Sequence, residues 1–301
     1  MKSFIIIFLV CFNLYGKNIT PSEVYTQVIV IEDEIHYLLK YFNLANKYKK
    51  VENRIISTEL KPRNVWQKTY EIMIKINILR NKYNLPRIEP VNMSPVLNLN
   101  PDSVYEQVKR ILTEIEVFKV RVGIKSPDFN VHKYKNKKPV DVFNKLSYVS
   151  NLLDILNRGE VTSSSVFSEN MRIYDDILLI LDYLNIDDNT IPANKNNKAT
   201  STEAFYIGMK TLEKIKQIQI LAGIEFIDFN EFKKDKHNSS EVFEITQMII
   251  SELQTVKAYI GVDSVTVPGR PYKTKTAAEV EQLMSWNLRK LNLINMYSFR
   301  R

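Results

Sequence analysis

Aromatic residues at regular intervals are the first feature of this sequence that suggests ligand chemistry. Each follows a Val or Ala directly, and the seven are Tyr25, Trp66, Tyr105, Phe143, Phe167, Phe205 and Phe243. Four positions after that Val or Ala, four copies carry a small or polar residue: Thr69, Asn170, Gly208 and Thr246. A layer of this kind beside aromatic rings could line a pocket for a small, anionic ligand. The seven aromatics, with Thr69, Asn170 and Thr246, are therefore candidate ligand-binding residues. The alternative is that each aromatic packs on a neighbouring helix.

Two similar segments form a second candidate site. They are Asp128-Phe129-Asn130, followed by His132, and Asp228-Phe229-Asn230, followed by His237. Asp, Asn and His side chains can bind divalent metals. The spacing fits no known metal motif, and Asp and Asn commonly bond to their own turn while a Phe packs onto the core. We therefore predict no metal and keep an enzyme or metal-binding site around Asp128 and Asp228 as the alternative.

No recognised catalytic arrangement occurs in the sequence. His36 follows Glu32-Asp33-Glu34-Ile35, but no nucleophile lies at a known spacing, and a solvated helix face accounts for it. Gly-rich phosphate loops, Gly-x-Ser-x-Gly elbows and His-Glu-x-x-His motifs are absent from the sequence. One Cys and three His exclude multi-cysteine metal sites and iron–sulfur clusters. We expect a non-enzymatic protein without a cofactor.

The elements that position these residues are predicted from an internal period of about 38 residues. The anchor positions are 24, 65, 104, 142, 166, 204, 242 and 280, which gives steps of 41, 39, 38, 24, 38, 38 and 38 residues. Apolar residues recur 7, 11 and 14 positions after most anchors, as in Ile31, Ile35 and Leu38. This spacing is that of a helical stripe. It predicts an all-α protein of eight long helices formed by an internal repeat.

Both ends of each predicted helix have sequence signals. Thr20-Pro21-Ser22-Glu23 combines an N-cap, an early Pro and a capping-box Glu, and several other copies resemble it. Nineteen residues after six of the anchors stands a Gly or Asn, followed by an apolar residue, which is typical of a Schellman-type helix end. The six are Asn43, Asn84, Gly123, Asn185, Gly223 and Gly261. Each full helix should have about 22 residues and a length of about 33 Å.

The lengths of the linkers restrict the topology. Most have about 13 to 16 residues, which at roughly 3.3 Å per residue is enough for the chain to return along the length of a helix. The linkers therefore allow neighbouring helices to be parallel as well as antiparallel. The short link at 158–161 predicts an antiparallel hairpin of the fourth and fifth helices. We expect either two four-helix bundles, in 17–158 and 159–301, or one continuous helical array.

Residues 1–16 resemble an export signal, because Lys2 precedes an apolar stretch from Phe4 to Leu14. We therefore expect cleavage near Lys17 and a periplasmic or secreted mature chain without Cys; the alternative is that the segment is retained as an anchor. The net charge of +8 favours anionic membrane or wall polymer over nucleic acid, since no continuous basic stripe occurs. The expected function is a binding, sensing or scaffold module of the cell envelope, with a protein or a small anionic ligand as partner. A pore-forming bundle is disfavoured by the lack of a long apolar run in the mature chain.

Overall fold

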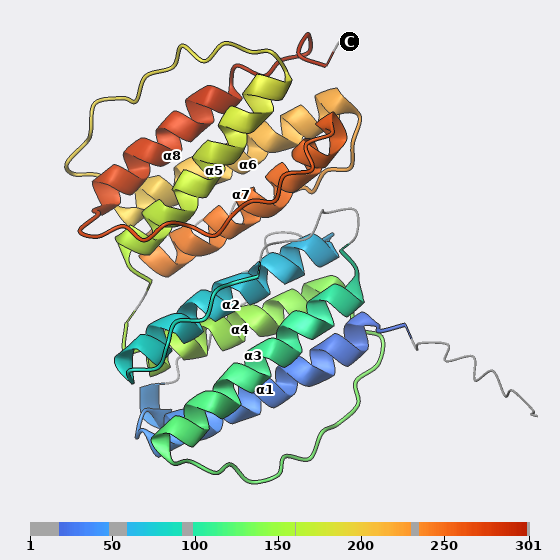
Figure 1. Cartoon of the computed structure of the whole chain (residues 1–301), viewed down its shortest axis with the longest axis vertical. Coiled ribbons are helices and arrows are strands. Elements are labelled where there is room, and N and C mark those ends of the chain that lie inside the picture. The colour runs from blue at the N-terminus through green and yellow to red at the C-terminus, as the bar shows by residue number, and fades with distance from the viewer. Residues whose placement is uncertain (1–17, 48–58, 92–98, 160, 230–234, 300–301) are drawn as a thin grey trace, which may run out of the picture.

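The computed structural model describes residues 18–47, 59–91, 99–159, 161–229 and 235–299. The predicted signal, residues 1–16, lies outside them. The described residues are helical with no strand (Figure 1). Besides a short 3-10 helix at Ala45–Lys47, the α-helices are α1 (Pro21–Tyr41), α2 (Pro62–Lys82), α3 (Pro101–Val122), α4 (Pro139–Leu156), α5 (Ser163–Tyr183), α6 (Ser201–Ala222), α7 (Ser239–Ile260) and α8 (Ala277–Leu291). The prediction of an all-α chain is confirmed, while the origin of its helices in a repeated sequence stays a prediction.

The N-terminal signals act as predicted. The backbone N–H of Thr20 donates to the Glu23 carboxylate at 2.8 Å, and the N–H of Asn238 donates to Glu241 at 2.8 Å. In α4 the short Asp141 side chain accepts from the N–H of Lys138, also at 2.8 Å. These bonds satisfy backbone donors that have no acceptor inside the helix.

The helix ends are also as predicted. Backbone φ is positive at all six expected residues, from 54° at Asn84 to 81° at Gly261. The N–H of the next residue then bonds back to the last turn, as Leu44 does to the Leu39 carbonyl at 2.7 Å and Ile224 to the Gln219 carbonyl at 3.0 Å. The described helices have 15 to 22 residues, and α4 and α8 are the two shortest.

The helices form two four-helix bundles with the same arrangement. In the first, α1 and α2 each pack on both α3 and α4; in the second, α5 and α6 each pack on both α7 and α8 (Figure 1). In the first bundle α1 and α2, which are consecutive in the chain, therefore lie diagonally opposite each other, and so do α3 and α4. The predicted stripe fills both interiors, with Ile31, Ile72 and Ile111 buried in the first bundle and Ile177 and Ile215 in the second.

All four helices of each bundle run in the same direction. The first residues of α1 to α4 surround one small space, which is lined by Pro21, Val24, Pro62, Val65, Pro101, Val104, Pro139 and Val142. The first turns of α5 to α8 surround a matching space in the second bundle. The linker lengths are compatible with both parallel and antiparallel helices, and the structure has the parallel arrangement.

The linkers make the parallel arrangement feasible by returning along the helices. Residues 125–137 run beside α1 in the opposite direction: the Tyr37 hydroxyl donates to the Lys125 carbonyl, and the N–H of Lys137 donates to the Ser22 hydroxyl. Residues 266–275 run back along α5 in the same way, from Thr266 beside Asp176 to Lys275 beside Ser164. In these two cases the chain runs one helix in one direction and returns as an extended segment in the other.

Parallel helices place like ends of their dipoles together, which is unfavourable. Side-chain charges offset this. Six helices carry a carboxylate in the first turn, at Glu23, Asp102, Asp141, Glu203, Glu241 and Glu279. Five helices carry Lys or Arg in the last turn, among them α1 with Lys40 and α3 with Arg121.

The expected hairpin of the fourth and fifth helices is wrong. Residues 157–162 do join the end of one bundle to the start of the other, but α4 and α5 are not packed as a pair; the extensive contact between the bundles is that of α2 with α7. These two helices are antiparallel, since Arg63 meets Glu252 and Lys68 meets Glu244. The short link reverses the direction of a whole bundle and not of one helix.

Candidate ligand cleft between the bundles

The predicted aromatic residues are distributed among separate sites of packing. Tyr25 meets Tyr134 of the returning linker with ring centroids 5.0 Å apart and planes at 71°, and Phe167 meets Tyr272 at 5.0 Å and 70°. Phe205 stacks on His237 at 3.7 Å. These rings hold the linkers against the helices, so the sequence pattern of Val plus aromatic has a structural use.

The other predicted aromatics lie beside further helices or cations. Trp66 stacks on Tyr70 with centroids 6.4 Å apart. Lys68 lies 5.4 Å from the centre of the Phe143 ring, and Lys109 lies 5.7 Å from that of Tyr105. Of the ten predicted residues, Phe243 lines the cleft described below. Ligand binding by the other nine stays a prediction.

The predicted polar positions are buried in the bundles. The Thr69 hydroxyl donates to the Trp66 carbonyl, and the Asn170 amide donates to the Thr246 hydroxyl at 3.2 Å and to the Val166 carbonyl at 2.9 Å. In the same layer of the second bundle, Gly208 lets the Ile245 side chain approach closely. Asn170 and Thr246 thus bond within the interior of the second bundle.

The two linker motifs belong to different bundles. Asp128 is exposed, whereas Asp228 forms an ion pair with Lys216; Asn230 lies outside the described residues. Among the residues that the structure describes, no group of three or more His, Cys, Asp or Glu could hold a metal ion. His36 faces Tyr148, with Nε2 3.1 Å from the hydroxyl, and burial lowers its pKa.

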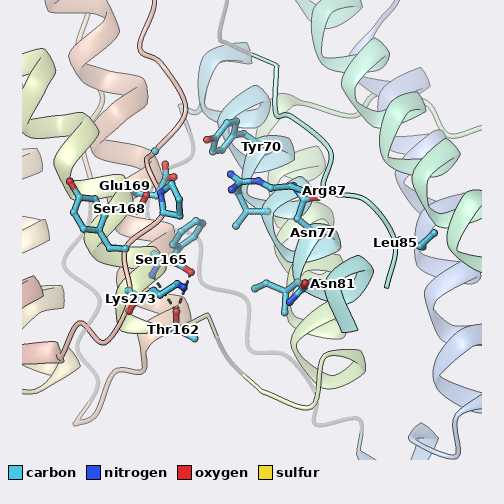
Figure 2. Close-up of a pocket in the computed structure, with 17 residues that line it drawn as sticks. Tyr70, Asn77, Asn81, Leu85, Arg87, Thr162, Ser165, Ser168, Glu169 and Lys273 are labelled. Carbon is cyan, nitrogen blue, oxygen red and sulfur yellow. Dashed lines mark hydrogen bonds between the residues drawn. The ribbon is translucent and has the colours of Figure 1, made fainter. Parts of the chain in front are cut away.

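A cleft of about 540 Å³ lies at the junction of the two bundles (Figure 2). One wall is α2 with the segment that follows it, and the opposite wall is the first two turns of α5 with residues 269–273 of the last linker. Its lining residues are Tyr70, Ile74, Asn77, Ile78, Asn81, Leu85, Arg87, Thr162, Ser164, Ser165, Ser168, Glu169, Phe243, Gly269, Pro271, Tyr272 and Lys273. Apolar and polar groups are mixed, as in sites that bind small organic molecules.

A set of buried polar contacts between α2 and α7 lies beside the cleft. We call them the polar seam: Arg63, Asn64, Gln67 and Lys68 of α2 with Glu244, Gln247, Ser251 and Glu252 of α7. Arg63 donates to both Glu252 oxygens, at 3.0 and 3.1 Å, and Lys68 lies 3.0 Å from Glu244. Burial alone would lower the pKa of Lys68, but Glu244 and Glu71 raise it above its ordinary value. Where the two bundles meet, the cations of the polar seam are therefore paired with carboxylates.

The seam continues into the cleft wall through Glu169. The Gln247 amide donates to Glu169 at 3.2 Å, and Arg172 forms an ion pair with the same carboxylate. The Arg172 guanidinium also lies 4.6 Å from the centre of the Tyr70 ring. Arg172 thus neutralises the Glu169 carboxylate, Gln247 donates a further hydrogen bond to it, and Tyr70 is fixed between the two bundles.

The segment after α2 is fixed to that helix by side-chain bonds. The Asn77 amide donates to the Ile88 carbonyl, and its oxygen accepts from the Ile88 N–H, both at 2.8 Å. The Arg80 guanidinium donates to the Pro86 carbonyl, also at 2.8 Å. These bonds hold the backbone on either side of Arg87, whose side chain reaches toward the second bundle (Figure 2).

Sequence reasoning missed the cleft because its walls come from segments that are far apart in the chain. Tyr70, Arg87 and Lys273 stand in no motif. One signal was present: the fifth helix begins with Ser163-Ser164-Ser165 after Thr162, without the Pro or the carboxylate found at most other helix starts. That difference marks the helix end that faces the cleft.

No protein-family model matches this sequence, and no curated protein or solved structure is significantly similar to it. Within the described part of the chain, none of the helices combines the length and the apolar character that crossing a membrane requires.

Proposed function

We propose that the protein is a binding module that holds a small molecule in the cleft between its two bundles. The observation that carries this proposal is the cleft itself: about 540 Å³, with apolar and polar lining, walled by two bundles that a paired polar seam holds in register. The volume lies within the range of small-molecule sites. We further propose that the protein is exported and has a sensing or scaffold role in the cell envelope.

Binding without chemistry is favoured by the nature of the lining. Glu169 is occupied by Arg172 and Gln247, and the Ser168 hydroxyl donates to the Arg270 carbonyl at 2.5 Å. The Ser164 hydroxyl accepts from the N–H of Lys275 at 3.0 Å. These bonds suit recognition, which needs fixed donors and acceptors, more than nucleophilic attack, which needs an adjacent base.

An occlusion experiment tests the proposal. The full chain is incubated with the low-molecular-mass fraction of its source cells and freed of unbound material. Retained molecules are identified by mass spectrometry after denaturation. Asn81→Trp places a large ring at the exposed edge of the cleft, while Val120→Trp changes a residue that is 79% exposed on the outer face of α3.

We expect the parent and Val120→Trp to retain the same molecule and Asn81→Trp to lose it. Trp66, stacked on Tyr70, gives a second readout, because a ligand against Tyr70 should change its fluorescence. Equal retention by all three proteins, or no retention by any of them, would contradict the proposal.

A further inference from the structure

The Tyr70 hydroxyl is a buried donor for which the described residues supply no acceptor. Tyr70 is 3% exposed, and its hydroxyl donates a hydrogen bond to no described residue. Burial is the main reason that its pKa is raised, so the hydroxyl keeps its proton at neutral pH. The backbone N–H of Gly269 faces it but can only donate. An unmet buried donor costs on the order of 1–3 kcal/mol, so the site favours a ligand oxygen there.

Two cations, Arg87 and Lys273, line the same cleft. Among the described residues, neither Arg87 nor Lys273 forms an ion pair, although both belong to the lining. Figure 2 shows Arg87 and Tyr70 on the same side of the cleft, and the charge of Arg87 acts on the Tyr70 hydroxyl. Lys273 lies beside Thr162 and Ser165 (Figure 2).

The first turn of α5 adds partial positive charge at the Lys273 end. Thr162 caps the N–H of Ser165 through its carbonyl and its hydroxyl, which leaves the N–H groups of Ser163 and Ser164 without an acceptor inside the helix. The macrodipole is positive at this end. The other helices of the second bundle each place a Glu in the first turn, at Glu203, Glu241 and Glu279, but α5 has no acidic residue there. The one carboxylate in the lining, Glu169, is already paired with Arg172.

The geometry points to a small organic anion as the ligand, with its negative group at the first turn of α5 beside Lys273 and an acceptor oxygen at Tyr70 and Arg87. This inference rests on the proposed function and specifies its ligand class. The charge of Glu169 acts on the Tyr70 hydroxyl, and both residues line the cleft. Glu169 stands seven residues after Thr162, so the two contacts are about 10 Å apart along the helix. The ligand is therefore elongated, with a phosphate or carboxylate at one end.

A calorimetric panel on the full chain tests the ligand class. The probes are inorganic phosphate, pyrophosphate, citrate and glycerol 3-phosphate, with glycerol as the neutral match for the last. Sedimentation with phosphatidylglycerol and phosphatidylcholine vesicles, run in parallel, distinguishes a lipid headgroup from a free anion. The variants are Lys273→Gln, Arg87→Gln and Tyr70→Phe, and Lys198→Gln, which removes an exposed charge outside the cleft lining, is the control.

We expect at least one anion to bind saturably while glycerol does not, and each cleft variant to weaken that binding by about tenfold, the loss of one charge-assisted bond. Tyr70→Phe should leave the melting temperature unchanged or higher, since it removes an unmet donor; a purely structural Tyr70 would lower it. Lys198→Gln should bind as the parent does.

The failures of the two proposals can be distinguished. If Asn81→Trp abolishes retention of a molecule that proves to be neutral, the cleft binds a ligand but the anion inference is overturned. Equal binding of an anion by the parent and Lys273→Gln, or no binding of any anion in solution or on vesicles, would also overturn it. If no molecule is retained and no probe binds, both proposals fall.

Discussion

Within each bundle the helices meet mainly through Ile, Leu and Val, with ion pairs such as Lys75–Asp154 near the edge, whereas between the bundles α2 and α7 meet through Arg, Lys, Gln, Asn and Glu. Both regions are buried: Ile111 in the first interior is 0% exposed, and Lys68 in the polar seam is 2% exposed. Apolar packing is non-directional and insensitive to small rotations, while the seam needs each donor to face its acceptor. The apolar interiors therefore determine that each set of four helices forms a bundle, and the polar seam determines how α2 and α7 are aligned with each other.

The largest effect is expected from a charge placed in a bundle interior. Ile111→Asp buries an unpaired carboxylate and should lower the free energy of unfolding by roughly 4 kcal/mol or more. Val120→Asp, on the outer face of the same helix, should change it by less than about 0.5 kcal/mol. Denaturant titration followed by circular dichroism measures both, and similar melting of the two variants would show that the stripe is not the core.

A smaller effect is expected from the polar seam. Arg63→Met leaves Glu252 with Asn64 and Gln219 as donors but without its cation, which should cost about 2–4 kcal/mol. Adding Glu252→Met should recover most of that loss, because an apolar pair can replace a buried ion pair. A double-mutant cycle gives the coupling energy. Additive effects of the two substitutions would mean that the pair does not act as a unit.

The tightness of the interior predicts the third effect. A Cβ added at Gly208 would lie 2.7 Å from the Ile245 side chain, so Gly208→Ala should cost about 1–3 kcal/mol through overpacking. Gly159 has open space around it, and Gly159→Ala is the matched control with little expected change. Thermal unfolding of both variants checks this prediction. Equal melting temperatures of the two variants would indicate that the interior of the second bundle can accommodate an extra methyl group.

The smallest effect is expected at a helix cap, outside both regions. Bonds from Lys275, foremost, and from Thr276 lower the pKa of Glu279 from 4.5 to about 2. A lowered carboxyl pKa stabilises the fold above the unfolded value, so this contribution is present above pH 4.5 and is lost as the pH falls toward 2. Glu279→Gln should therefore lower the melting temperature slightly at neutral pH and not near pH 2. Glu106→Gln, at an exposed Glu of α3, is the control; a difference that persists unchanged in acid would contradict the assignment.

The sequence was sufficient for the elements but not for their assembly across the seam. Caps such as Asn238 and stops such as Asn84 act through residues three to six positions away, so their bonds can be predicted locally. Lys68 and Glu244, by contrast, are charged residues on two helices about 175 positions apart, and each by itself is typical of a solvated face. The cleft depends on that long-range pairing, and hence Tyr70 and Arg87 could not be recognised beforehand.

The common direction of the four helices has a consequence for how such units could be joined. The chain enters a bundle at one end and leaves it at the other, about a helix length away. An up-and-down bundle of four antiparallel helices would bring its first and last residues to the same end. Here a connector as short as residues 157–162 is enough to start a second bundle beside the first, and the same geometry would accept a third without a long crossover.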